Sequence, residues 1–282
     1  MLTVSLVTPS LNQARYLDEA LRSVLDQDDP ALEYVVADGG STDASVEIIQ
    51  RRAAELTAWW SEPDGGHADA VNKGFARTSG EIMGWLNSDD WLLPHALEIV
   101  RELFDRFPEV HWLTSGFPVT LDERGRPVRV GRTNGFARDP YLLGLNGVRS
   151  WSRSYFVQQE STFWRRELWD AAGGALDPSY EPAADFELWA RFFEHAELWT
   201  VDTTIGAFRI HDAQRTASQL DAYRAQALRA LPPATSARLA ASRATARLPA
   251  GARRRARIGW TAPVITWSTR LHDWQATRRH VP

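Results

Sequence analysis

The sequence predicts an α/β fold with a mainly parallel sheet and flanking helices. Three observations support this expectation. Apolar, β-branched runs alternate with amphipathic stretches over the first 107 residues, turn residues follow each apolar run, and 44% of the 282 residues are hydrophobic. Apolar runs of strand length that alternate with helical periodicity are typical of β–α–β units. The length suits one large domain with an extension.

The first 107 residues are expected to hold four strands and four helices in alternation. Leu17, Leu21 and Leu25 recur at the spacing of one helix face after Asn12, which is a suitable helix cap. The expected strands cover residues 3–10, 32–38, 56–62 and 81–87, and the expected helices cover residues 14–27, 43–55, 67–78 and 94–107.

The alternation fades after residue 108, where shorter strands and two helical stretches, 165–173 and 183–196, predict mixed structure. From residue 212 the sequence becomes rich in Ala and Arg and is interrupted by prolines, which predicts broken helix. The expected domain limits are 1–211 for the α/β domain, with halves 1–107 and 108–211, and 212–282 for a basic helical extension.

The net charge of −4 hides a strong asymmetry. Residues 224–282 contain 12 Arg and one acid, whereas the first 223 residues carry a formal charge of −15, which indicates a different partner for each part. Cys is absent, so any metal must bind to oxygen or imidazole ligands, which favours Mg²⁺ or Mn²⁺. No secretory leader and no apolar stretch of about 18 residues is found, so we expect a cytoplasmic protein.

Acidic side chains gather in the loops that follow the expected strands. The stretch "MGWLNSDDWLLP" sets an apolar run against Asp89 and Asp90, and Asp38 and Asp64 follow two other strands. Ligands of open α/β sheets bind outside the carboxyl ends of the strands, so these acids are expected to converge on one site. A nicotinamide site is disfavoured because "PSLNQARYL" replaces the glycine-rich turn that should follow the first strand.

A nucleotide-sugar site explains this arrangement better. A carboxylate at the end of the second strand can accept the ring N3–H of uracil or thymine. A divalent cation held by the acids of "NSDD", residues 87–90, can bridge a diphosphate and neutralise the charge that develops on it as it leaves.

Four stretches resemble, in order, the motifs of the family 2 glycosyltransferases, which have the GT-A fold. They are "VTPSLNQARYLDEALRSVLDQ", "VVADGGSTDAS", "SEPDGGHADAVNKGFARTSGEIMGWLNSDD" and "ADFELWARF". The resemblance is dense over residues 3–100 and thinner to about 211. It implies a GT-A domain with a Rossmann-like sheet and an inverting transferase of the hexosyltransferase type.

The resemblance also implies roles in nucleotide binding. Pro9 and Asp38 would line the nucleobase pocket, Asp64 would lie beside the nucleoside, and Ser10 would also bind the nucleotide. Lys73, the single lysine of the chain, is a candidate for phosphate binding, and the alternative is an ion pair with the acid four residues earlier.

"NSDD" matches the Asp-x-Asp motif of the family, which implies a metal site. Asp89 would be the metal-binding acid, and Asn87 stands where an Asp is more usual, so its amide would meet the cation, a water or a ribose hydroxyl. His211 resembles a late His that some members use as a second metal ligand, and a solvated or capping His is the alternative. Asp90 is expected either to bind the metal or to support the loop.

The motif "ADFELWARF" implies the catalytic base. Asp185 would take the proton of the acceptor hydroxyl, which then attacks the anomeric carbon opposite the leaving diphosphate. Glu187 lies two residues away and cannot share its helix face, so it is assigned to the acceptor side. Glu160 and Trp164 of "QQESTFWRRELW" would also border the acceptor, although core packing is the competing expectation for any one Trp.

The end of the chain, residues 252–282, combines Arg with aromatic residues. Trp260, Val264, Trp267, Leu271 and Trp274 recur at intervals of four and three, so a helix starting near residue 262 would present them as one stripe. Such a helix would touch an anionic membrane surface as a peripheral contact, or pack on the protein or a second subunit. Nucleic acid is disfavoured because no recognised binding module accompanies the charge.

These features predict an inverting, metal-dependent glycosyltransferase that uses a UDP- or dTDP-sugar and a glycan or lipid-linked acceptor. A sugar nucleotidyltransferase is disfavoured because no glycine-rich, basic triphosphate loop occurs near residue 10. A non-catalytic nucleotide-sugar or glycan-binding protein is the alternative from another class.

Overall fold

The computed structural model describes residues 1–146, 148, 156–212, 214, 219–234, 239–241, 244 and 259–281. The strands are β1 (Val4–Ser10), β2 (Leu32–Asp38), β3 (Ala58–Ser61), β4 (Ile82–Trp85), β5 (Trp91–Leu92), β6 (Trp112–Ser115), β7 (Val119–Leu121), β8 (Pro127–Val130), β9 (Thr162–Arg165), β10 (Trp199–Val201), β11 (Gly206–Arg209), β12 (Trp260–Ser268) and β13 (Asp273–Val281). The α-helices are α1 (Ala14–Leu25), α2 (Ser45–Arg52), α3 (His67–Phe75), α4 (Ala96–Arg106), α5 (Arg138–Leu142), α6 (Arg166–Ala171), α7 (Ala184–His195) and α9 (Leu220–Ala230), with 3₁₀ turns η1 (Ala53–Glu55), η3 (Gln159–Ser161) and η4 (Pro178–Tyr180).

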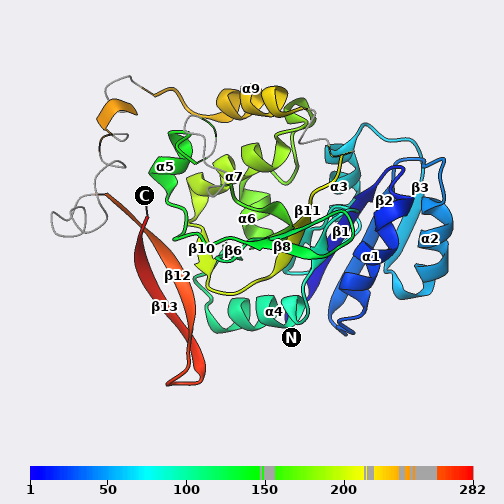
Figure 1. The fold of residues 1–282 in the computed structure, drawn as a ribbon, viewed down its shortest axis with the longest axis horizontal. Coiled ribbons are helices and arrows are strands. Elements are labelled where there is room, and N and C mark those ends of the chain that lie inside the picture. Colours follow the sequence, from blue (N-terminus) through cyan, green and yellow to red (C-terminus); the bar gives the residue numbers. More distant parts are fainter. Residues whose placement is uncertain are drawn as a thin grey trace.

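The larger of two sheets has the strand order β13-β12-β10-β6-β9-β4-β1-β2-β3, and the smaller sheet has the order β5-β11-β7-β8 (Figure 1). The pairs of β1 with β2 and β4, and of β2 with β3, are parallel. β9 runs antiparallel to both β4 and β6. The expected α/β fold with a mainly parallel sheet is confirmed.

The first half follows the pattern of the sequence because its central strands, β1 and β4, are apolar runs buried on both faces. All seven residues of β1 are buried, and α3 packs closely on it, since a Cβ at Gly74 would lie 2.4 Å from Val7 Cγ1. The four strands and four helices expected over residues 1–107 are all present, with ends shifted by a few residues.

The cap expected for the first helix is wrong. Asn12 has a positive φ of 53° and lies outside α1, whose N-cap residue is Gln13. The N–H of Ala14 instead donates to Asp43 Oδ2 at 3.0 Å, and the N–H of Ser45 donates to Asp43 Oδ1. One carboxylate from the β2–α2 loop therefore serves the starts of two helices.

The end of the chain corrects the expectation of a helix from residue 262. Residues 260–281 form a β-hairpin whose first strand pairs in parallel with β10 and so extends the larger sheet. The run "TAPVITWST" is rich in β-branched residues, which favour a strand, and Pro263 precedes the ladder to β10, which begins at Val264. Trp267 and Trp274, seven residues apart, face each other across the hairpin with ring centroids 5.3 Å apart.

Ion pairs also fasten the hairpin to the rest of the protein. Arg278 pairs with Glu197 at 2.7 Å, and Arg279 pairs with Asp202 at 2.6 Å. Residues 252–258, which carry most of the expected cationic cluster, lie outside the described residues. Among the helices of the described ranges, none has the length and apolar character needed to cross a membrane.

Candidate functional site

Three polar residues meet at the carboxyl edge of the parallel strands. Ser10 ends β1, Asp38 ends β2 and Ser61 ends β3, and the parallel register puts each beside the next. Pro9 is buried in β1 directly before Ser10. The Ser10 hydroxyl is buried and has no hydrogen-bond partner in the part of the chain that the structure describes, so it is available to a ligand at this edge.

Asp38 organises the loop that follows β2. Its carboxylate accepts hydrogen bonds from the hydroxyls of Ser41 (2.5 Å) and Ser61 (2.7 Å) and from the N–H groups of Gly40 and Ser41. Asp38 has no exposed surface. A nucleobase can therefore reach this carboxylate only if Ser41 rotates away from Oδ1.

Asp64 and Lys73 lie on the next loop and helix. Asp64 accepts a hydrogen bond from the N–H of Gly66 at 2.8 Å, and its carboxylate lies against Gly39, beside Asp38. Lys73 Nζ pairs with Asp69 Oδ2 at 2.9 Å, so the i,i+4 ion pair that competed with a phosphate role is present.

Three of the polar residues in the loop after β4, Asn87, Asp89 and Asp90, have different environments. Asn87 Oδ1 lies 2.9 Å from His67 Nε2, and its Nδ2 donates to Asp90 Oδ2 at 3.3 Å. The amide thus links α3 to the loop, an arrangement that a carboxylate at position 87 would disturb by repelling Asp90. Asp89 is the member of the loop that points toward His211, with Oδ2 3.0 Å from Nε2.

Arg209 of β11 holds this loop in place. Its side chain is fully buried and lies between the rings of Tyr16 and Trp91, with the guanidinium carbon 4.8 and 5.1 Å from their centroids. Nε donates to the carbonyl of Asp89 at 2.8 Å, and Nη2 donates to Glu19 Oε2 at 2.6 Å. The backbone N–H of Arg209 also donates to Asp90 Oδ1 at 2.9 Å.

His211 lies two residues after the end of β11. It is buried against Tyr16, with the two ring centroids 4.5 Å apart. A solvent-exposed side chain was one of the alternatives expected for His211, and its burial excludes that alternative. In the described residues, Nδ1 has no hydrogen-bond partner, while Nε2 faces Asp89.

Two buried acids beside Asp89 have raised pKa values. Burial, together with the charges of Asp89 and Glu160, raises the pKa of Asp90 well above its ordinary value. Burial, followed by the charges of Asp185 and Asp89, raises the pKa of Glu160 to about 8. Glu160 precedes β9, which runs antiparallel to β4 and therefore starts at the same edge of the sheet. The charges of Asp89 and Asp185 both act on the carboxyl of Glu160, so this acid couples the two parts of the site electrostatically.

Asp185 stands in the first turn of α7. Burial raises the pKa of its carboxyl to about 6, while hydrogen bonds from the N–H of Phe186 (2.7 Å) and from the Tyr223 hydroxyl limit the rise. A carboxylate with a pKa near the working pH is suited to accept a proton.

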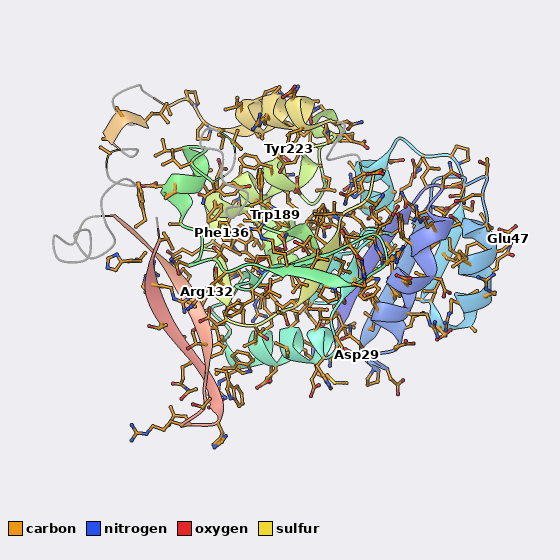
Figure 2. The ribbon with its side chains drawn as sticks, viewed as in Figure 1. Asp29, Glu47, Arg132, Phe136, Trp189 and Tyr223 are labelled. Atoms are coloured by element: carbon orange, nitrogen blue, oxygen red, sulfur yellow. The ribbon has the colours of Figure 1, made fainter. Side chains whose placement is uncertain are left out.

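Trp164 was wrongly assigned to the acceptor side. It has no exposed surface and packs among the rings of Trp85, Trp189 and Phe192, with centroid distances of 5.5 to 5.6 Å. Figure 2 shows Trp189 in the middle of the molecule. β9 is a central strand covered on both faces, so its large side chain fills the core instead of a binding surface.

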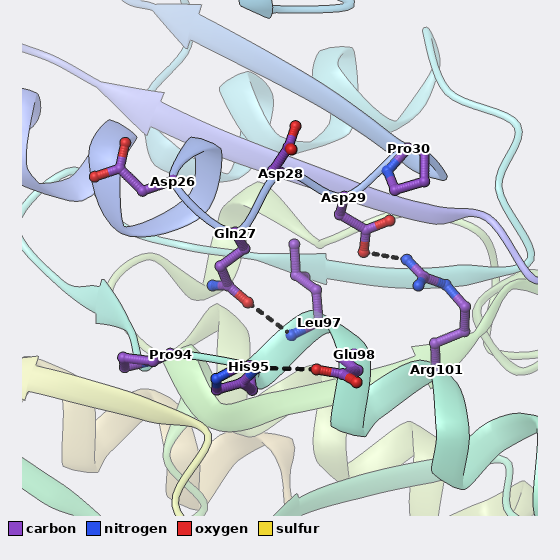
Figure 3. A pocket seen from close by; sticks show the side chains of 10 residues that line it. All are labelled: Asp26, Gln27, Asp28, Asp29, Pro30, Pro94, His95, Leu97, Glu98 and Arg101. Atoms are coloured by element: carbon purple, nitrogen blue, oxygen red, sulfur yellow. Dashed lines mark hydrogen bonds and ion pairs between the residues drawn. The ribbon is translucent and has the colours of Figure 1, made fainter.

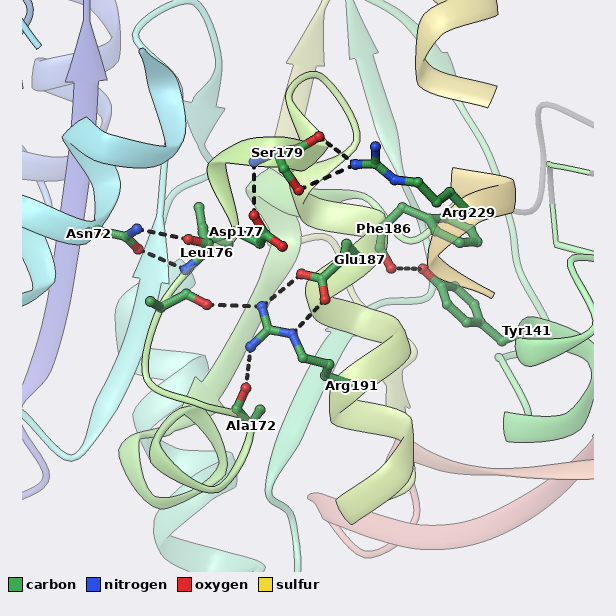
Figure 4. A network of polar contacts seen from close by, with 11 residues as sticks. Asn72, Tyr141, Ala172, Leu176, Asp177, Ser179, Phe186, Glu187, Arg191 and Arg229 are labelled. Carbon is green, nitrogen blue, oxygen red and sulfur yellow. Dashed lines mark hydrogen bonds and ion pairs between the residues drawn. The ribbon is translucent and has the colours of Figure 1, made fainter. Parts of the chain in front are cut away.

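Glu187 was also wrongly assigned to the acceptor side. Both of its oxygens accept hydrogen bonds from Arg191, at 2.7 and 2.8 Å, and Arg191 in turn donates to the carbonyls of Ala172 and Ala175 (Figure 4). Glu187 therefore fastens α7 to the loop after α6.

A cavity of about 320 Å³ lies elsewhere, at the amino edge of the sheet between the end of α1 and the start of α4 (Figure 3). Its charged residues are largely paired, since Arg101 contacts Asp29 and His95 contacts Glu98. The acids of the candidate site lie at the opposite edge, so this cavity has no part in their chemistry.

The described residues contain no group of three or more His, Asp or Glu arranged to hold a metal. Asp89 and His211 form a pair, and a carboxylate oxygen with an imidazole nitrogen is a donor set that Mn²⁺ accepts. Such a pair fits a divalent cation whose other ligands come from a diphosphate and water.

A family model described as "Glycosyl transferase family 2" matches residues 5–159, more than half of the chain. An uncharacterized glycosyltransferase from Nostoc sp. is 36% identical over 104 residues, which are 36% of this chain and 32% of that protein. Another from Rickettsia typhi is 23% identical over 225 residues, which are 79% of this chain and 69% of that protein. The chain thus matches about a third of the length of the Nostoc relative.

Two solved structures share the fold. S. aureus TarS 1–349 in complex with UDP-GlcNAc has a TM-score of 0.58 at 18% identity and covers 77% of this chain and 61% of that one. Mannosyltransferase PcManGT from Pyrobaculum calidifontis in complex with GDP-Man and Mn²⁺ has a TM-score of 0.60 at 20% identity and covers 90% of this chain and 79% of that one. The GT-A fold expected from the sequence is confirmed.

Arg209, His67 and Tyr223 contribute to this region without having been predicted from the sequence. A signal for Arg209 was present, because strand alternation sets it on the same face as Ala207 and His211 in "GAFRIH". Residues on that face are buried, and a buried cation requires hydrogen-bond or ion-pair partners. His67 and Tyr223 gave no such signal, since their contacts depend on tertiary packing.

We predict that Arg209→Lys lowers the free energy of unfolding by about 2–4 kcal/mol, because an ammonium cannot replace a planar donor group that reaches several buried acceptors. Urea denaturation measures this change. Arg126→Lys, in an exposed pair with Asp122, is the matched control and should stay within about 0.5 kcal/mol of the wild type. Equal midpoints for the two variants would contradict the stabilising role of Arg209.

Proposed function

The chain belongs to glycosyl transferase family 2, and from this premise we propose that it is an inverting, metal-dependent glycosyltransferase. It would move a sugar from a UDP- or dTDP-sugar to a hydroxyl of a glycan or lipid-linked acceptor. One observation carries the proposal: a pair suited to a metal, Asp89 and His211, and a carboxylate with a raised pKa, Asp185, both lie close to Glu160.

The donor is assigned to the carboxyl edge of β1 and β2. Once the Ser41 hydroxyl rotates away from Oδ1, Asp38 would supply an acceptor for the ring N3–H of uracil or thymine, and the unpartnered hydroxyl of Ser10 lies beside it. Asp64 and Asn87 border the same edge, which suits the nucleoside and its ribose. The solved relatives support a nucleoside diphosphate sugar, since one binds UDP-GlcNAc and the other GDP-Man.

The metal would be held by Asp89 and His211, with Mg²⁺ or Mn²⁺ as the candidates. The Mn²⁺ bound by PcManGT supports a divalent ion. Such a cation neutralises the charge of a leaving diphosphate. The chain's own contribution is to fix this pair, because Arg209 at the end of β11 holds the Asp89 backbone and His211 follows two residues later.

Asp185 would act as the general base. Its pKa of about 6 leaves it mainly ionised at neutral pH, so it can take the proton of the acceptor hydroxyl as that oxygen attacks the anomeric carbon. Glu160, with a pKa of about 8, keeps its proton at neutral pH and can donate a hydrogen bond to a sugar hydroxyl. The two acids are therefore assigned different roles.

We predict metal-dependent binding of UDP or dTDP. Calorimetric titration with UDP, dTDP and GDP, each with Mn²⁺ and again with excess EDTA, measures it. Asp89→Ala should lose the metal-dependent part of the affinity, because it removes one of two protein ligands. Glu47→Ala, which removes an exposed carboxylate on α2 (Figure 2), should bind like the wild type. No binding of any diphosphate under either condition would contradict the donor assignment.

We predict that Asp185→Asn keeps the donor affinity of the wild type and lowers transfer by about 10²- to 10⁴-fold, the usual effect of losing a positioned base. Release of nucleoside diphosphate from the sugar donor measures transfer. Near-normal transfer by this variant would refute the assignment of the base. Donor binding without transfer by the wild type, over a panel of acceptors, would favour the non-catalytic alternative.

We also propose a peripheral contact with the cytoplasmic face of a membrane through the hairpin tip. Trp267 and Leu271 are 46% and 60% exposed, and the tip stands apart from the rest of the structure (Figure 1). Exposed Arg270 and His272 flank them, which suits an anionic lipid surface.

Co-sedimentation with liposomes that contain phosphatidylglycerol tests this contact. The double variant Trp267→Ser and Leu271→Ser should lose several-fold in binding, because it removes the apolar side chains that would enter the interface. The control replaces Val128 and Val130 of β8, which are 59% and 61% exposed, by Ser and should bind like the wild type. Equal binding of all three proteins would exclude the tip as the contact.

A further inference from the structure

The hairpin of β7 and β8 carries a row of arginines on the surface of a strongly acidic part of the chain. Residues 124–132 contain four arginines and no acid, whereas the first 223 residues as a whole carry a formal charge of −15. All four are exposed: Arg124, Arg126, Arg129 and Arg132. β8 is the outer strand of the smaller sheet, and Figure 1 shows it on the near face of the molecule. Residues 124–132 therefore form a cationic strip that a large ligand can reach.

Most of the charge of the cationic strip has no partner in the protein. Arg126 forms an ion pair with Asp122 at 2.6 Å. Within the ranges that the structure describes, Arg124, Arg129 and Arg132 form no ion pair with a carboxylate. Two arginines of β13, in contrast, are both paired with acids. Charges of one sign that lie close together repel one another, so a ligand of opposite charge stabilises the strip.

The cationic strip belongs to the same sheet as the strands that precede and follow the proposed metal ligands. β8 pairs with β7, β7 pairs in parallel with β11, and β11 pairs with β5. Asp89 lies two residues before β5, and His211 lies two residues after β11. Neighbouring strands are about 4.8 Å apart, so β8 runs roughly 10 Å from β11. A ligand that lies along β8 is therefore close to the proposed catalytic site.

The turn of the hairpin is fixed to the end of β11. Leu121, the last residue of β7, pairs with Arg209, and its carbonyl accepts a hydrogen bond from the N–H of Ile210 at 2.9 Å. The carbonyl of Glu123 accepts a hydrogen bond from Arg209 Nη1 at 3.2 Å. His211 follows directly after Ile210. The cationic strip thus begins one residue after a contact with β11, near His211, and leads away along β8.

We propose that the cationic strip binds an acceptor glycan that carries negative charges along its chain, as phosphate or carboxylate groups. The inference rests on the proposed function, because it names the class of acceptor for that reaction. The guanidinium group is planar and binds carboxylate or phosphate oxygens with two parallel donors. The proposed site contains several acids, among them Asp89, Glu160 and Asp185, and would repel such a chain. The cationic strip offsets this repulsion.

The shape of the cationic strip favours a chain over a single anion or a membrane. Its arginines are spread along an extended hairpin instead of converging on one point, so a single phosphate is too small to contact them all. The large exposed apolar residues of the strip are Val128 and Val130. They lack the aromatic rings that interfacial segments insert into lipid. A glycan with repeated charges matches both the spread of the arginines and their polar surroundings.

Fluorescence anisotropy with labelled oligosaccharides tests the proposal. The probes are a galacturonate oligomer, a glycerol phosphate oligomer of the same charge and neutral maltohexaose, each with EDTA to exclude binding through a metal. The wild type should bind a charged probe, more weakly as salt is added, and should not bind maltohexaose. The triple variant Arg124→Gln, Arg129→Gln and Arg132→Gln should bind the charged probe about 5- to 50-fold more weakly, the combined effect of three exposed ion pairs.

The matched control is the triple variant Arg22→Gln, Arg51→Gln and Arg77→Gln, which removes the same charge from exposed positions outside the cationic strip. It should bind the charged probe like the wild type. Equal losses in the two triple variants would show an effect of net charge alone and overturn the proposal. Failure of the wild type to bind either charged probe would overturn it as well.

Liposomes that contain phosphatidylglycerol separate a glycan from a lipid surface. The variant of the cationic strip should sediment with them as the wild type does. Loss of liposome binding in this variant, with its oligosaccharide binding unchanged, would assign the strip to a membrane and overturn the proposal. Titration of the wild type with UDP or dTDP and Mn²⁺ tests the underlying function separately. If neither diphosphate binds, the proposed function fails, whereas the anisotropy titrations still decide whether the strip binds a charged glycan.

Discussion

The buried guanidinium of Arg209 is the interaction on which the rest of the site depends. A cation with no exposed surface must be compensated, and its partners come from elements that are far apart in the sequence: Glu19 of α1, the Asp89 carbonyl after β4 and the Glu123 carbonyl after β7. Separating any of them would leave part of this charge uncompensated in a low dielectric, so the elements are held together. Because the N–H of Arg209 also binds Asp90, one strand orients both acids of the loop.

The same region concentrates negative charge. Asp90, Glu160 and Asp185 all have raised pKa values because burial penalises their charged forms. Folding therefore takes up a proton at Glu160 between its ordinary pKa of 4.5 and about 8, so this carboxyl lowers the stability of the fold progressively as pH rises through that window. A bound cation relieves such repulsion, which explains in physical terms why a site that binds a diphosphate and a metal would accumulate acids at one edge.

The residues predicted best from the sequence are those that lie at the ends of parallel strands. Ser10, Asp38 and Asp89 follow apolar runs, and parallel pairing alone brings such positions to one edge. The predictions from the sequence were wrong where one spacing of residues is compatible with two secondary structures. Trp267 and Trp274 are seven residues apart, which suits two helical turns and also two opposed positions of a hairpin, and only pairing with β10 decides between them. Trp164 and Glu187 were misassigned because adjacency to a motif does not show whether a side chain faces the core or the surface.

The two halves of the site differ in how they are specified. The edge to which we assign the donor is built by backbone register, so its residues can be located from short motifs. The half that contains Asp185 is built by side chains that meet over long separations, such as Gln226 with the backbone of Ala183, and no local pattern encodes these contacts. A protein arranged in this way can change the helix that covers α7 while the register of β1, β2 and β4 keeps the opposite edge unchanged.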